Sequence, residues 1–139
     1  PLLDAYATLA PDGRFAAYQS LESGRREIYA RPASGEDRKW RISTEGGASP
    51  VWSRDGKEIF YLCGMKLMAV DVQPQGEDLR VGTPHILFEN HEIYWYDVAR
   101  DGKRFFVAEN PNPGMSSHLD VVVNWFSEVT RKVQEAKAP

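Results

Sequence analysis

The chain has 139 residues, a length typical of one domain, with 42% hydrophobic and 27% charged residues. This composition excludes a disordered chain, and a net charge of −3 without a basic cluster disfavours a nucleic-acid partner. The single cysteine, Cys63, excludes an internal disulfide, and its apolar neighbours predict a buried, unreactive thiol. No apolar run is long enough for a membrane span, and no signal-peptide pattern is present.

Three segments of the chain share one pattern built around an Asp-Gly pair, at residues 8–18, 51–61 and 97–107. The aspartates, Asp12, Asp55 and Asp101, lie 43 and then 46 residues apart. Such a period is typical of propeller blades and of helical arrays. Because each pair is followed by Arg or Lys and flanked by alternating apolar residues, it predicts a β-hairpin turn.

We interpret the three aspartates as turn residues whose carboxylates accept hydrogen bonds from their own backbone. They occur once per unit on one rim, so we do not expect them to converge on a common site. Before each turn, one inward position is occupied by Leu9, Trp52 and Val98. Trp40, Trp52 and Trp125 are expected to pack in the core or between sheets.

Further strands are expected in each unit. A third strand is predicted at 27–31, 66–72 and 118–123, and a fourth at 39–43 and 85–88, with Gly46-Gly47 and residues 73–78 as connecting turns. Four short antiparallel strands per repeat indicate a propeller blade. We therefore predict an all-β fold, a single partial propeller domain (1–139) with three blades at about 5–43, 48–90 and 92–124. A short helix is expected at 125–137, with Asn124 as its N-cap.

The turns resemble the TolB-like propeller repeat, whose hallmark is a Pro-Asp-Gly turn followed by Lys or Arg. Pro11 completes this turn in the first unit, and Arg replaces the proline in the other two. Longer phrases are similar to the last blades of propellers found on membrane-anchored bacterial serine/threonine kinases and related sensors: WRISTEGG (40–47), PVWSRDG (50–56), KLMAV (66–70) and VVVNWF (121–126). The resemblance implies a bacterial, extracytoplasmic sensor or scaffold, and it does not identify a ligand.

Three blades are too few for a closed ring, since propellers normally close with about four to eight. Two open flanks would remain, together with an unpaired strand edge. We expect either missing blades in a longer parent protein or a homo-oligomer, in which two copies supply six blades around a twofold axis.

No motif for nucleophilic, metal or cofactor chemistry is present, so we predict no catalytic residue, no metal and no cofactor. The sequence favours a non-enzymatic module that binds a protein, a peptide or a small ligand. The alternative is a propeller hydrolase or lyase whose central site forms on oligomerisation, with Glu92 and Asp97 of each copy near one axis.

The candidate ligand site consists of Glu92, Tyr94 and Tyr96, at the start of the inner strand of the third unit. We expect Tyr94 and Tyr96 to alternate on one face of that strand, opposite Trp95. Two aromatic rings and a carboxylate at a channel mouth could bind a sugar or a peptide. Packing between neighbouring blades explains the same residues equally well.

Overall fold

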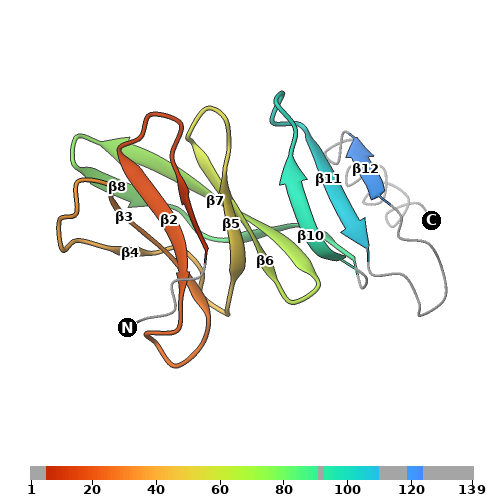
Figure 1. The fold of residues 1–139 in the computed structure, drawn as a ribbon, viewed down its shortest axis with the longest axis horizontal. Coiled ribbons are helices and arrows are strands. Elements are labelled where there is room, and N and C mark those ends of the chain that lie inside the picture. Colours follow the sequence, from red (N-terminus) through yellow and green to blue (C-terminus); the bar gives the residue numbers. More distant parts are fainter. Residues whose placement is uncertain (1–5, 91–92, 110–118, 124–139) are drawn as a thin grey trace, which may run out of the picture. The chain divides into compact units, whose positions relative to one another are not determined.

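The computed structural model describes residues 6–90, 93–109 and 119–123, where all regular structure is β-strand (Figure 1). The strands form three antiparallel sheets. The chain divides into two compact units, residues 1–91 with the first two sheets and residues 92–139 with the third. An all-β chain made of propeller-type antiparallel sheets is thus confirmed. The predicted helix at 125–137, with Asn124 and Trp125, lies outside the described residues.

The first sheet has four strands that pair in chain order: β1 (Ala7–Leu9), β2 (Phe15–Ser20), β3 (Glu27–Pro32) and β4 (Trp40–Arg41). The alternation in the sequence fixes its faces, because residues two apart in a strand point to the same side. Phe15 and Ala17 are buried on one face, and Leu9 and Ala16 face the other as register partners. The strands predicted at 27–31 and 39–43 are confirmed by β3 and β4.

The second sheet has five strands: β5 (Ala48–Trp52), β6 (Glu58–Cys63), β7 (Lys66–Gln75), β8 (Asp78–Val81) and β9 (His85–Glu89). The prediction that residues 73–78 only form a connecting turn was wrong. β7 continues to Gln75, turns at Gly76 with φ of 62°, and pairs with β8 in the register Gln75 to Asp78. The first half of β7 pairs with β9, so this long strand has a different partner along each half on that side of the sheet.

The third sheet contains β10 (Ile93–Val98), β11 (Arg104–Glu109) and β12 (Leu119–Val123), paired in that order. A β-bulge interrupts the register between Ile93 and Trp95. The long hairpin at 110–117 lies outside the described residues, as do His91 and His118.

The three Asp-Gly turns have the same geometry. One carboxylate oxygen of Asp12, Asp55 and Asp101 accepts the backbone N–H two residues later, at 3.0, 3.1 and 3.0 Å. The following glycines have φ values of 72°, 71° and 67°, a left-handed conformation that glycine adopts without a Cβ clash. The turn role of the aspartates is confirmed.

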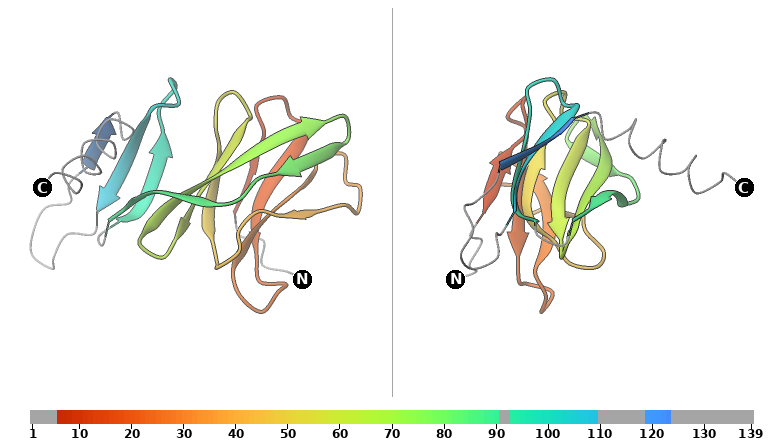
Figure 2. Two further views of the ribbon diagram at one scale, coloured as in Figure 1. Left: turned by 180° about the vertical axis from the view of Figure 1, so that it is seen from behind. Right: turned by 90° about the vertical axis from the view of Figure 1, so that its right-hand side faces the viewer.

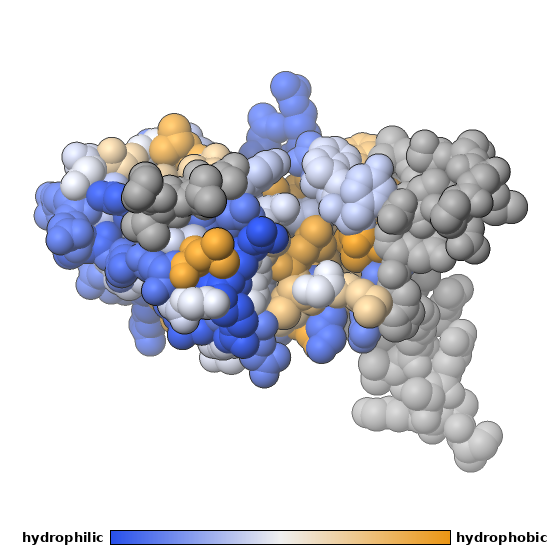
Figure 3. Space-filling view, turned by 60° about the horizontal axis from the view of Figure 1, so that its bottom comes forward, coloured by the Kyte–Doolittle hydropathy of each residue, from blue (hydrophilic) through white to orange (hydrophobic). Residues whose placement is uncertain are grey.

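The core of the first unit lies between its two sheets. Phe15, Ala17 and Ile28 of the first sheet form one cluster with Trp52, Ile59, Tyr61 and Val70 of the second. The indole Nε1 of Trp52 donates to the Thr8 carbonyl at 3.2 Å, and the ring of Trp40 meets Phe15 edge-on with centroids 5.8 Å apart. Both tryptophans thus pack as predicted. Outside this core, Figure 3 shows apolar patches on a mostly hydrophilic surface.

The hairpin of β7 and β8 extends across the first sheet, beside β2 and β3 (Figure 2). Leu79 is 3% exposed and belongs to the same core cluster as Phe15. At the tip, Arg14 Nη2 donates to the Gly76 carbonyl at 3.0 Å. A segment of the second sheet therefore covers the first.

The connection from the first sheet to β5 is fixed by a buried carboxylate. The Glu27 side chain is fully buried and pairs with Arg25 at 2.6 Å and Arg41 at 2.5 Å. It also accepts hydrogen bonds from the Ser43 hydroxyl and from the Gly46 N–H at 3.0 Å. Burial opposes ionisation, but these hydrogen bonds, first of all that from Ser43, outweigh it and hold the pKa of Glu27 below its usual value.

Candidate ligand-binding groove

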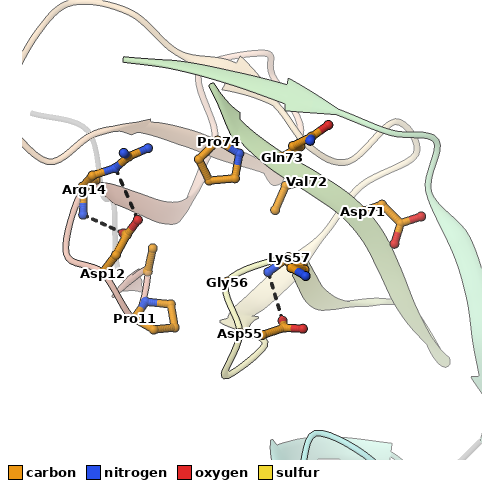
Figure 4. Close-up of a pocket in the computed structure, with 11 residues that line it drawn as sticks. Pro11, Asp12, Arg14, Asp55, Gly56, Lys57, Asp71, Val72, Gln73 and Pro74 are labelled. Carbon is orange, nitrogen blue, oxygen red and sulfur yellow. Dashed lines mark hydrogen bonds and ion pairs between the residues drawn. The ribbon is translucent and has the colours of Figure 1, made fainter. Parts of the chain in front are cut away.

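An open groove of about 670 Å³ lies between the first two Asp-Gly turns and the second half of β7 (Figure 4). The first turn contributes Ala10, Pro11, Asp12 and Arg14, the second Asp55, Gly56 and Lys57, and β7 the residues from Asp71 to Pro74. The groove exists because the pairing of β6 with β7 starts only at Glu58 and Asp71, while β7 continues past Asp71 toward the first sheet. It is therefore built by the repeat together with the unexpected hairpin.

The lining is amphipathic. Ala10, Pro11, Val72 and Pro74 are apolar, and charged side chains stand among them (Figure 4). Arg14 and Asp12 point toward each other at 3.3 Å from Nε to Oδ2, so these two charges neutralise one another. Such a surface offers both an apolar floor and polar anchoring points.

The carboxylate of Asp55 accepts hydrogen bonds from residues of its own turn. It accepts the Ser53 hydroxyl at 2.7 Å and the Lys57 N–H at 3.1 Å. These hydrogen bonds, with that from Ser53 the larger cause, hold the pKa of Asp55 below its usual value. Asp55 therefore remains ionised, and both of these hydrogen bonds go to its Oδ1.

Three polar groups of the groove remain available. Within the described part of the chain, the Asp71 carboxylate, the Lys57 ammonium and the Gln73 amide have no hydrogen-bond or ion-pair partner. Asp71 and Lys57 lie on the same wall, because the Val72 N–H donates to the Lys57 carbonyl at 2.8 Å, and the first turn lies across the groove from them (Figure 4). This wall thus offers a ligand the Asp71 carboxylate and the Lys57 ammonium, with the ionised Asp55 carboxylate two residues from Lys57.

An acidic neighbour adjoins the Asp71 wall. Glu58 is the register partner of Asp71 on β6, so two carboxylates stand opposite each other across the strands. Burial is the main cause that raises the pKa of Glu58, and the charges of Asp71 and Asp55 raise it further. The sheet tolerates this like-charge pair at some cost in stability.

The predicted ligand site is only partly described. Glu92 lies outside the described residues. The expectation that Tyr94 and Tyr96 share one face was wrong, because the bulge between Ile93 and Trp95 shifts the alternation. Tyr96 is 3% exposed, whereas Tyr94 and Trp95 are 58% and 42% exposed. The exposed aromatic pair is thus Tyr94 and Trp95.

Asp12 and Asp55 both line the groove, and each carboxylate accepts hydrogen bonds within its own turn. One further expectation needs correction. Cys63 is half-buried rather than buried, with its sulfur 3.5 Å from the Glu45 carbonyl, because it ends β6 at a turn. Within the described ranges, no group of three or more His, Cys, Asp or Glu side chains could hold a metal ion.

Few features of the sequence indicate the groove. Its β7 wall falls in the segment that we interpreted as a turn, since Pro74 and Gly76 are turn-like residues. The available signal was the shared rim of the Asp-Gly turns, which places Asp12 and Asp55 on one side of adjacent sheets.

Comparison with solved structures defines the class as a β-propeller. TolB from Acinetobacter baumannii superposes with a TM-score of 0.67 and 19% identity over 88% of this chain and 30% of TolB. The acylaminoacyl peptidase of Pyrococcus horikoshii matches with a TM-score of 0.50 and 19% identity, over 81% of this chain and 19% of the peptidase. The fold is that of a TolB-like propeller, and the chain spans less than a third of either neighbour.

Other comparisons add no relative. No protein-family model matches the sequence, and no curated protein matches it. In the part of the chain that the structure describes, no helix is long and apolar enough to cross a membrane.

Proposed function

We propose that this chain is part of a TolB-like propeller that works as a non-enzymatic binding module, and that the groove between its first two turns binds an extended peptide. The observation that carries the proposal is the amphipathic groove of about 670 Å³, with Asp71 and Lys57 on one wall without an ion-pair partner in the described part of the chain. Small-molecule sites usually enclose most of their ligand, whereas an open groove suits a segment of chain.

The backbone of β7 supports this choice of ligand. The Val72 N–H donates to the Lys57 carbonyl at 2.8 Å, just before β6 begins at Glu58. Backbone groups two residues apart face the same side of a strand, so Pro74 faces the groove without an N–H to offer. This edge therefore presents acceptors and fits a ligand that brings donors, such as peptide N–H groups.

The free charges suggest the side chains of the peptide. A basic side chain would pair with Asp71 and an acidic one with Lys57, which gives the bound segment a direction. From the sequence resemblance we further propose that the parent protein is a bacterial sensor or scaffold with an extracytoplasmic propeller, of the kind attached to membrane-anchored kinases.

Panning phage-displayed random peptides on the immobilised chain, followed by anisotropy titrations with the selected synthetic peptides, tests the proposal. Asp71→Asn and Lys57→Gln should each weaken binding about fivefold, the effect of losing roughly 1 kcal/mol. The controls are Asp37→Asn, in an exposed loop, and Lys103→Gln, the counterpart of Lys57 in the third turn. Failure to select any peptide, or equal effects of test and control variants, would reject the groove as a peptide site.

A further inference from the structure

The open face of the first sheet is identified by the internal repeat. Aligned on the Asp-Gly pairs, Leu9 corresponds to Trp52, and Ala16 corresponds to Ile59. Trp52 and Ile59 are register partners on the face of the second sheet that packs against the first, and they are 6% and 0% exposed. Leu9 and Ala16 are likewise register partners, yet Leu9 is 60% exposed. The second sheet therefore buries this face, whereas the equivalent face of the first sheet is open at Leu9.

The same alignment shows what kind of surface covers such a face. The first sheet meets the second with the face that carries Phe15 and Ala17. Their counterparts in the third sheet are Arg104 and Phe106 on β11. Phe106 is only half-buried, whereas Phe105 on the opposite face is 1% exposed. The Phe106 face of the third sheet thus corresponds to the face with which the first sheet covers the second.

We propose that the Leu9 face of the first sheet docks onto the Phe106 face of the third sheet in a second copy of this chain. The contact would repeat the interface between the first and second sheets. A twofold axis would form it twice, so two copies would close one ring of six blades, a number within the range in which propellers close. The groove residues take no part in this contact, so the inference does not depend on the proposed peptide site.

The known interface predicts which residues should meet. Trp52 reaches the Thr8 carbonyl at 3.2 Å. The counterpart of Trp52 is Leu9, and the counterpart of Thr8 in the third repeat is Asp97. Leu9 of one copy should therefore lie beside Asp97 of the other.

Sedimentation velocity on the full chain, from low to high micromolar concentration, is the first test. A species of twice the 15.7 kDa chain mass is expected. Leu9→Asp should abolish it, because the interface would bury the new carboxylate beside Asp97 of the other copy. Leu21→Asp is the matched control, since Leu21 is 50% exposed but lies in the hairpin between β2 and β3, and it should leave the dimer unchanged. A monomer at all concentrations, or equal behaviour of both variants, would overturn the proposal.

Cross-linking tests the pairing of faces without relying on a destabilising charge. In a Cys63→Ser background, Leu9→Cys combined with Asp97→Cys should give a covalent dimer with a short thiol cross-linker, and neither single cysteine should do so. A ladder of higher oligomers would show an open chain of copies, and a link within one chain would show that it closes on itself. Either result would contradict the two-copy ring.

Discussion

Replacement of Glu27 by glutamine tests the buried carboxylate that fixes the link between the first two sheets. The fully buried side chain binds two arginines, the Ser43 hydroxyl and the Gly46 N–H. Glutamine keeps the shape, but its NH₂ group must face donors where a charged oxygen accepted them. Removing one partner of a buried ion pair costs about 3–5 kcal/mol. Because Arg25 and Arg41 are 55% and 46% exposed and can turn to water, we expect a loss near the lower limit, about 3 kcal/mol.

The pH dependence gives this prediction a second readout. The pKa of Glu27 is lowered in the folded chain, so its stabilisation is present above the pKa of an unfolded glutamate, about 4.3, and is lost as the pH falls through the folded value. The gap between wild type and Glu27→Gln should therefore be full at neutral pH and narrow below about pH 4.

Urea unfolding at fixed protein concentration, followed by tryptophan fluorescence, measures the effect. Glu36→Gln is the control, because Glu36 also binds an arginine, Arg38 at 2.7 Å, but its side chain is 45% exposed. This surface pair should be worth less than about 1 kcal/mol. A Glu27→Gln variant as stable as Glu36→Gln, or a gap that does not change with pH, would refute the reasoning.

Three other substitutions probe separate features by the same unfolding assay. Glu58→Gln should stabilise the chain by about 0.5 kcal/mol at neutral pH by removing the repulsion from Asp71. Because the pKa of Glu58 is raised in the folded chain, this gain in stability should vanish as the pH falls below about 4. A loss of stability at neutral pH would contradict this. Gly47→Ala should cost about 1–3 kcal/mol, because its Cβ would lie 2.7 Å from Cγ1 of Ile28, and an unchanged midpoint would count against the close approach. Leu79→Ala should cost about 2–5 kcal/mol if the β7–β8 hairpin is an integral part of the core, and a loss under 1 kcal/mol would show that it is not.

The turns and the inner strands could be predicted because their signals are local. An Asp-Gly pair between alternating apolar residues specifies its own hydrogen bonds, and all three turns have the expected geometry. The packing of Trp52 followed from the repeat, since the predicted inward position before the turn is buried in the second unit, whereas Leu9 at the same position of the first unit is 60% exposed. These features depend on residues within a few positions of one another.

The missed features depend on distant partners. Pro74 and Gly76 are typical turn residues, and only the first sheet, which buries Leu79, favours a strand after them. The bulge at Tyr94 leaves no mark in the alternation of a short aromatic run, because it is a property of the pairing with β11. The groove could not be predicted for the same reason, since one of its walls is the unrecognised hairpin.

The crossing hairpin also determines what can fold alone. The first sheet obtains part of its apolar cover from Val72 and Leu79, which follow it in the chain by more than thirty residues. A polypeptide that stops after the first repeat would leave Phe15 and Trp40 without that cover. We therefore expect that a single repeat does not fold alone, and hydrogen exchange in β2 and β8 should report a single shared opening event.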